Sequence, residues 1–165
     1  MYLFRLIYYS RNTLAEVEQP RQRAELKAIL ASAQKNNPPL GVTGALLYNQ
    51  SYFAQVLEGD RKAVTEVFCR IARDERHSDL VILEGRPITK RRFADWSMCF
   101  AGQPVAEEVY RRYCVSNQFN PAKMGADSLL GFMEELVDLA PHAVHADRPQ
   151  PPAAPRVGAE KLVLA

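Results

Sequence analysis

Several features that mark particular classes of protein are absent from this sequence. Its 165 residues include only three cysteines, Cys69, Cys99 and Cys114, and these form no C-x-x-C pair. An odd, widely spaced set argues against a disulfide framework or a zinc site, and it favours a reducing compartment, so we expect a cytoplasmic protein. No apolar run reaches the roughly 18 residues that a membrane helix needs, and the first residues do not resemble a signal peptide.

The charge balance and the glycine pattern exclude further classes. The chain has 21 Lys and Arg against 19 Asp and Glu, a net charge of +2, which is far from the basic excess of a general nucleic-acid binder. Neither G-x-G-x-x-G nor G-x-x-x-x-G-K-[ST] occurs, so the dinucleotide fingerprint and the P-loop are missing. His142 and His145 have metal-like spacing but no third ligand, so we expect no metal site.

What the chain does contain is the hydrophobic periodicity of an α+β domain in its first 100 residues. Residues 2–9 are apolar on both faces, as in a buried strand, and Leu26, Ile29, Leu30 and Ala33 recur at helical spacing. The predicted strands are 2–9, 42–48, 52–58, 79–85 and 92–100, and the predicted helices are 21–36 and a second one from an N-cap at Asp60 to about 74–77. The resulting order, β-α-β-β-α-β-β, contains the split β-α-β pattern of a ferredoxin-like sheet with two helices on one face.

The remainder of the chain divides into two parts. Helices predicted at 105–115 and 123–139 are apolar enough to cover the second face of the sheet, so we expect a helical extension over residues 101–140. Residues 141–165 are rich in proline and alanine, which predicts a disordered tail. Because a residue before proline avoids the helical region of backbone conformation, we also expect Asn37, which precedes Pro38, to leave the first helix.

Two polar residues lie on strand faces that should be apolar. Gln55 shares a face with Phe53 and Leu57, and Tyr8 ends the face that begins at Phe4. A buried amide needs partners for its oxygen and its two N–H donors. Taken alone, Gln55 is explained by bonds to the backbone, and Tyr8 is explained as a core tyrosine.

Other polar candidates also have ordinary explanations when each is taken alone. Asn36 and Asn37 end the first helix and are explained as cap residues. Arg70 and Asp74 stand four apart, as in a surface ion pair on the second helix. Trp96 and Met98 share a strand face with Phe100 and are explained as core residues. Together, however, these residues indicate a slot between the two helices and the sheet that would hold a planar aromatic ligand with a polar edge.

At these residues the sequence resembles the BLUF family of blue-light sensors that use FAD. The matching stretches follow the family order and cover residues 1–100. They are RLIYYS at 5–10, QKNNP at 34–38, GVTGALLY at 41–48, FAQVLEG at 53–59, RIARDERH at 70–77 and RRFADWSM at 91–98. The last third resembles the two-helix extension of the short, stand-alone members, with no effector domain attached.

The resemblance implies a role for each candidate residue. Tyr8 is implied as the photoactive tyrosine and Gln55 as the glutamine between it and the flavin. Trp96 and Met98 are implied as the pair that relays the signal. The implied FAD-binding residues are Ile29, Asn36, Asn37, Phe53, Gln55, Arg70, Asp74 and His77.

The resemblance therefore favours a photoreceptor without enzymatic turnover. We expect a downstream signalling protein as its partner, no contact with nucleic acid or membrane, and a homo-oligomer. The alternative is a flavin-dependent reductase or monooxygenase of ferredoxin-like fold, which would need an open route to the flavin. A plain interaction module would be colourless.

Overall fold

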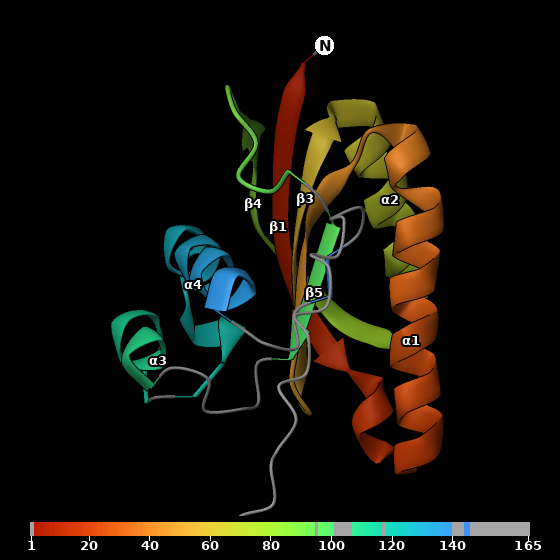
Figure 1. Cartoon of the computed structure of the whole chain (residues 1–165), viewed down its shortest axis with the longest axis vertical. Helices are drawn as coiled ribbons and strands as arrows, with labels where there is room; N and C mark the ends of the chain where they lie inside the picture. The colour runs from red at the N-terminus through yellow and green to blue at the C-terminus, as the bar shows by residue number, and fades with distance from the viewer. Residues whose placement is uncertain (1, 95, 101–106, 117, 140–143, 146–165) are drawn as a thin grey trace, which may run out of the picture.

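The protein forms a mixed sheet with helices on both faces (Figure 1). This computed structural model describes residues 2–94, 96–100, 107–116, 118–139 and 144–145. The strands are β1 (Leu3–Asn12), β2 (Thr43–Tyr48), β3 (Tyr52–Asp60), β4 (His77–Pro87), β5 (Trp96–Phe100) and β6 (Val144–His145). The α-helices are α1 (Gln19–Asn36), α2 (Arg61–Ala72), α3 (Glu107–Tyr113) and α4 (Ala126–Leu139), and 3-10 turns lie at Thr13–Glu16, Pro38–Leu40 and Pro121–Lys123.

The strand order confirms the ferredoxin-like prediction. Within the described residues the sheet runs β4-β1-β3-β2-β5-β6. Each neighbouring pair among its first four strands is antiparallel, and β5 then pairs parallel to β2. In Figure 1, α1 and α2 cover one face of the sheet while α3 and α4 lie on the other, as the sequence predicted.

Strand parity divides the interior into two cores. On the α1/α2 side, Leu6, Tyr8, Phe53 and Leu57 pack with Val64. On the α3/α4 side, the alternate residues of the same strands pack against the C-terminal helices. That second core includes Ile7, Ala45, Leu47, Ala54, Val56, Phe93, Leu129, Phe132, Met133 and Leu136. The sheet therefore separates the region of Tyr8 and Gln55 from the helical extension by a single layer.

The connection from α1 to β2 begins where the sequence predicted. The α-helix ends at Asn36, so Asn37 leaves the helix as expected, although its dihedral angles, φ −79° and ψ −42°, stay in the helical region. The chain passes directly into the 3-10 turn, where the Asn37 carbonyl accepts hydrogen bonds from the amides of Leu40 and Val42. Gly41 ends this turn at φ 64°, a conformation that favours glycine.

The ends of other elements also shift. The second helix ends at Ala72, short of the predicted 74–77, and β4 begins at His77. From the predicted tail 141–165, the structure describes only Val144–His145, a short strand beside β5. The rest of that prediction, including His142, lies outside the described residues. No helix in the described part of the chain is long and apolar enough to cross a membrane.

Candidate functional site

A narrow cavity lies between α1, α2 and the sheet, and we call it the slot. Its walls combine apolar side chains with amides, charged groups and an imidazole. Its volume is about 90 Å³. Its lining is Ile29, Ser32, Ala33, Asn36, Asn37, Leu46, Gln55, Val67, Arg70, Ile71, Asp74, Arg76 and His77. The structure thus brings together seven of the predicted flavin-contacting residues, while Phe53 and Tyr8 lie in the core on the same side of the sheet.

Tyr8 and Gln55 occupy opposing positions on β1 and β3, at the base of the slot. The fully buried Tyr8 hydroxyl donates a hydrogen bond to Gln55 Oε1. Burial raises the pKa of Tyr8 well above its ordinary value, and the nearby charge of Asp74 raises it further. Phe68 packs edge-on against the Tyr8 ring, with centroids 5.2 Å apart. Tyr8 is therefore a neutral proton donor at physiological pH.

The two asparagines at the end of α1 are not equivalent. Asn37 is buried, whereas Asn36 is only partly so and its Nδ2 donates to Ser32 Oγ at 3.1 Å. Both line the slot. A buried amide at the wall of a dry cavity can offer a donor and an acceptor to the edge of a ligand.

His77, the first residue of β4, also lines the slot. Its Nδ1 lies 2.8 Å from Ser10 Oγ in a hydrogen bond, and its ring lies 4.4 Å from the Phe53 ring, centroid to centroid. Burial lowers the pKa of His77 to about 4, although the carboxylate of Asp74 opposes the shift. The imidazole is therefore neutral at pH 7.

Asp74 pairs with Arg76 rather than with Arg70, contrary to the sequence prediction. Arg76 Nε donates to Asp74 Oδ1 at 2.8 Å. Arg76 Nη1 lies 3.3 Å from Glu25 Oε2 on α1. The hydrogen bond from Arg76 lowers the pKa of Asp74. The helical i, i+4 rule failed here because α2 ends at Ala72, before Asp74.

Sequence reasoning missed three polar residues of this region: Arg76, Ser10 and Glu25. Arg76 and Ser10 lie inside the stretches that carry the family resemblance, so their position was a usable signal. No feature of the sequence pointed to Glu25, because its contact with Arg76 depends on how α1 lies beside the segment after α2.

The predicted relay residues lie on β5, at the edge of the slot's floor. Trp96 is in register with Gly44 of β2, and Met98 is in register with Leu46, whose side chain lines the slot. The backbone thus places Met98 one strand away from a lining residue. A relay role for Trp96 and Met98 stays a prediction.

The chemistry of the slot fits a flavin ring. Leu46, Val67 and Ile71 offer apolar walls for the faces of the ring, and Gln55 and Asn37 offer polar groups for the edge of the ring. The apolar side of α1 packs against the core, but no residue of α1 is fully buried. Because ligand sites usually measure roughly 300 Å³ or more, a three-ring system would need α1 and α2 to move apart.

Comparison with known proteins agrees with this chemistry. The family model described as "BLUF: Sensors of blue-light using FAD" matches residues 3–99, more than half of the chain. The chain belongs to the BLUF family. BLUF domains are flavin-using sensors of blue light, and the match covers the slot, Tyr8 and Gln55.

BLUF relatives include both short proteins and long ones. The chain is 35% identical over 93 residues to the photoactivated adenylate cyclase subunit beta of Euglena longa, which covers 56% of this chain but 11% of that protein. The chain thus spans about one tenth of the length of this curated relative.

Solved BLUF structures match more of the chain. The photo-activated state of BlsA has 29% identity and a TM-score of 0.69, covering 82% of this chain and 94% of that one. The dark state of BlrB has 30% identity and a TM-score of 0.63, covering 81% and 96%. Klebsiella pneumoniae BlrP1 with FMN and cyclic diGMP has 38% identity and a TM-score of 0.51, covering 59% and 25%.

Proposed function

We propose that this protein senses blue light with FAD bound in the slot, and that light rearranges the hydrogen bond between Tyr8 and Gln55. The observation that carries this proposal is that bond, which is buried at the base of a cavity between α1 and α2. Two buried polar groups of this kind cost stability unless they have hydrogen-bond partners.

Bound flavin would supply the absorption of blue light and a strong electron acceptor. Tyr8 is the only group in this pair that can give up an electron together with a proton, and its O–H already points at Gln55 Oε1. The Gln55 amide has an acceptor end and a donor end, so its rotation or tautomerisation changes which neighbour receives a hydrogen bond. In a dry site, such an exchange has a larger energetic effect than in water.

We propose that eight residues hold the flavin. The buried amides of Asn37 and Gln55 and the partly buried amide of Asn36 face its polar edge, and the remaining contacts come from Ile29, Phe53, Arg70, Asp74 and His77. The family description names FAD, while the neighbour BlrP1 is described with FMN. We propose FAD for this chain.

The output of the sensor is proposed to be a light-dependent contact with another protein, without enzymatic turnover in this chain. The reason is the single layer between the slot and α4: Ala54 and Val56, on either side of Gln55, pack in the core with Phe132 and Met133. Trp96 and Met98 on β5 are proposed as the relay to α3 and α4. We further propose a cytoplasmic protein that binds neither nucleic acid nor membrane.

A homo-oligomer is also proposed, and the burial of α4 bears on which part of that helix could contribute to it. The apolar side of α4 is buried against the sheet, and Leu139 at its end is an exposed large apolar residue. The oligomer surface would therefore involve the end of α4 rather than its length.

The deciding experiment is the absorption spectrum of the purified protein before and after blue light. A yellow protein with a small red shift that reverses in the dark, without added reductant, supports the sensor. A colourless protein contradicts flavin binding. Bleaching of the flavin by a nicotinamide donor, with oxygen uptake and no photoshift, would instead indicate the reductase or monooxygenase.

A further inference from the structure

The side chain of Arg91 reaches from the segment before β5 to the start of β2 and the end of β3, and we call its contacts the Arg91 clasp. Arg91 Nη1 donates to Thr43 Oγ1 at 2.8 Å and to the Glu58 carbonyl at 2.7 Å. Nη2 donates to the Gly41 carbonyl at 2.7 Å. One guanidinium therefore joins two parts of the sheet, a geometry that its planar fork of donors suits.

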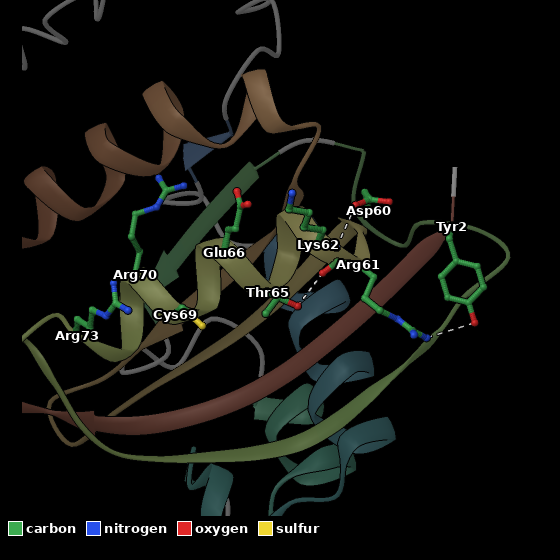
Figure 2. A pocket seen from close by; sticks show the side chains of 9 residues that line it. All are labelled: Tyr2, Asp60, Arg61, Lys62, Thr65, Glu66, Cys69, Arg70 and Arg73. Atoms are coloured by element: carbon green, nitrogen blue, oxygen red, sulfur yellow. Dashed lines mark hydrogen bonds between the residues drawn. The ribbon is translucent and has the colours of Figure 1, made fainter.

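The acceptors of the clasp belong to a firmly held part of the molecule. Strand β3 ends at Asp60, and Figure 2 shows Asp60 beside the first turn of α2, where it accepts from the Lys62 amide at 3.0 Å. Gly59 lies so close to the preceding turn that a Cβ there would stand 2.9 Å from the Gly41 oxygen. Arg91 is therefore bound to atoms whose own positions are fixed by β3, α2 and the turn.

Glu58 holds the same segment a second time, through its carboxylate. Its Oε2 accepts from the backbone amides of Arg92 and Phe93, at 2.8 and 3.0 Å. The carbonyl of Glu58 binds the side chain of Arg91, so consecutive residues before β5 are all attached to one residue of β3.

The parallel pairing of β5 explains why such an attachment is needed. The turn of a hairpin sets the register of its two strands, but a parallel strand reaches its partner by a long crossover that does not. From β2 to β5 the chain passes through β3, α2 and β4. Pairing of β5 with β2 begins at Trp96 opposite Gly44, the residue after Thr43. The clasp thus binds the chain at the end where the register of β5 is decided.

The register determines which residue of β5 stands at the slot. Met98 lies opposite Leu46, which lines the slot, and a slip by one residue would bring Ser97 or Cys99 to that position. We propose that Arg91 is a positioning residue, whose clasp sets the register of β5 on β2 and so keeps Met98 beside the slot. The register itself needs no flavin, whereas its effect on the photocycle rests on the proposed function.

The test compares Arg91→Gln with the wild-type chain, both kept in the dark. The backbone amides of Trp96–Phe100 should exchange with solvent at least about tenfold faster in the variant, because charge-assisted hydrogen bonds to three acceptors are lost. Nuclear Overhauser effects between Leu46 and Met98 should be joined by those of a second register. Where flavin is bound, the red-shifted state should return to the dark state at least about threefold faster, because the strand beside the slot no longer keeps one position.

The matched control is Arg92→Gln, which removes the same charge from the next residue. The Arg92 side chain pairs with Glu134 at 3.3 Å, and the variant keeps the backbone amide that binds Glu58, so exchange and recovery should not change. Thr43→Val removes a single acceptor of the clasp and should reproduce the changes to a smaller degree.

The outcomes separate the clasp from the photoreceptor. An unchanged β5 in Arg91→Gln, or an equal change in Arg92→Gln, would overturn the assignment of Arg91. Faster exchange of β5 with an unchanged dark recovery would overturn its effect on the photocycle. A colourless protein in which β5 still depends on Arg91 would support the clasp and overturn the photoreceptor proposal.

Discussion

Arg5 and Glu58 form an ion pair inside the protein, on the sheet face opposite Tyr8 and Gln55. Their side chains are 3% and 0% exposed, and Arg5 Nε lies 2.8 Å from Glu58 Oε1. The second carboxylate oxygen, Oε2, accepts from the backbone amides of Arg92 and Phe93, at 2.8 and 3.0 Å. Glu58 therefore fixes the segment that leads into β5, three positions along β3 from Gln55.

Loss of this carboxylate should be costly. Glu58→Ala would leave Arg5 Nε and two backbone amides without their acceptor in the interior, with only Glu84 Oε1, 3.7 Å from Arg5 Nη1, as a remaining carboxylate. We therefore expect the free energy of unfolding to fall by about 3–5 kcal/mol. Urea denaturation of the two proteins measures this change. Glu134→Ala is the matched control, since its pair with Arg92 is partly exposed and should contribute at most about 1 kcal/mol. Equal losses in both variants would contradict a structural role for the buried pair.

The burial of His77 predicts a dependence of stability on pH. The unfolded chain takes up a proton at His77 near pH 6.5, whereas the folded protein does so only near pH 4. Between these values the unfolded state binds more protons, so the free energy of unfolding should decrease as the pH falls, by about 3 kcal/mol in total.

Urea denaturation at pH 7.5, 5.5 and 4.5 checks this dependence. His77→Gln cannot titrate and should remove most of the decrease between pH 6.5 and 4.5. Asp74, whose pKa is lowered mainly by Arg76, acts in the same direction but at lower pH. A wild-type protein whose stability is level from pH 7.5 to 4.5 would mean that His77 is solvated in solution.

The asparagines at the end of α1 should determine flavin retention. Asn36→Ala removes a proposed partner of the ring edge and should weaken binding by about 1–3 kcal/mol, or abolish the photoshift. The flavin content of the purified variant and its light-minus-dark spectrum are the measurements. Because Asn37 is the more buried of the two, Asn37→Ala should have the larger effect. Unchanged flavin content and photocycle in both variants would remove these residues from the site.

The relay proposal predicts that a mutation can preserve the light-induced absorption shift while weakening the structural response of α3 and α4. Met98→Ala should leave the red shift largely intact, because Met98 lies on β5 rather than in the Tyr8–Gln55 pair. It should weaken any light-dependent change in α3 and α4. Hydrogen exchange of residues 107–139, in the dark and under blue light, compares the two proteins. If these helices respond equally in both, the signal does not pass through Met98.

Much of this architecture could be predicted from the sequence because it depends on periodicity. Alternation along residues 2–9 and 52–58 assigns Tyr8 and Gln55 to one face, and the structure confirms that face. Conformations and partners that depend on tertiary placement could not be predicted. Asn37 leaves α1 as predicted but keeps helical dihedral angles, because the following turn uses its carbonyl, and Asp74 pairs with Arg76 because α2 ends early.

The switch itself is tested at Tyr8, and the adjacent residue supplies the control. Tyr8→Phe keeps a ring of nearly the same volume, so folding and flavin binding should survive. It removes the hydroxyl that donates to Gln55 Oε1, so the reversible red shift should vanish. Gln55→Ala should also abolish the shift, because no amide remains to exchange partners. Absorption spectra before and after blue light measure all three proteins.

Tyr9 lies next to Tyr8 in β1 but points to the opposite face, where it packs against the core shared with α4. Its ring meets Tyr52 edge-on, with centroids 6.2 Å apart, and Tyr9 is not among the residues that line the slot. Tyr9→Phe should therefore leave the photoshift nearly unchanged and alter stability only slightly. A full red shift in Tyr8→Phe would refute the proposed electron and proton donor. Loss of the shift in Tyr9→Phe alone would mean that β1 presents the other face to the flavin, one residue out of register with the structure described.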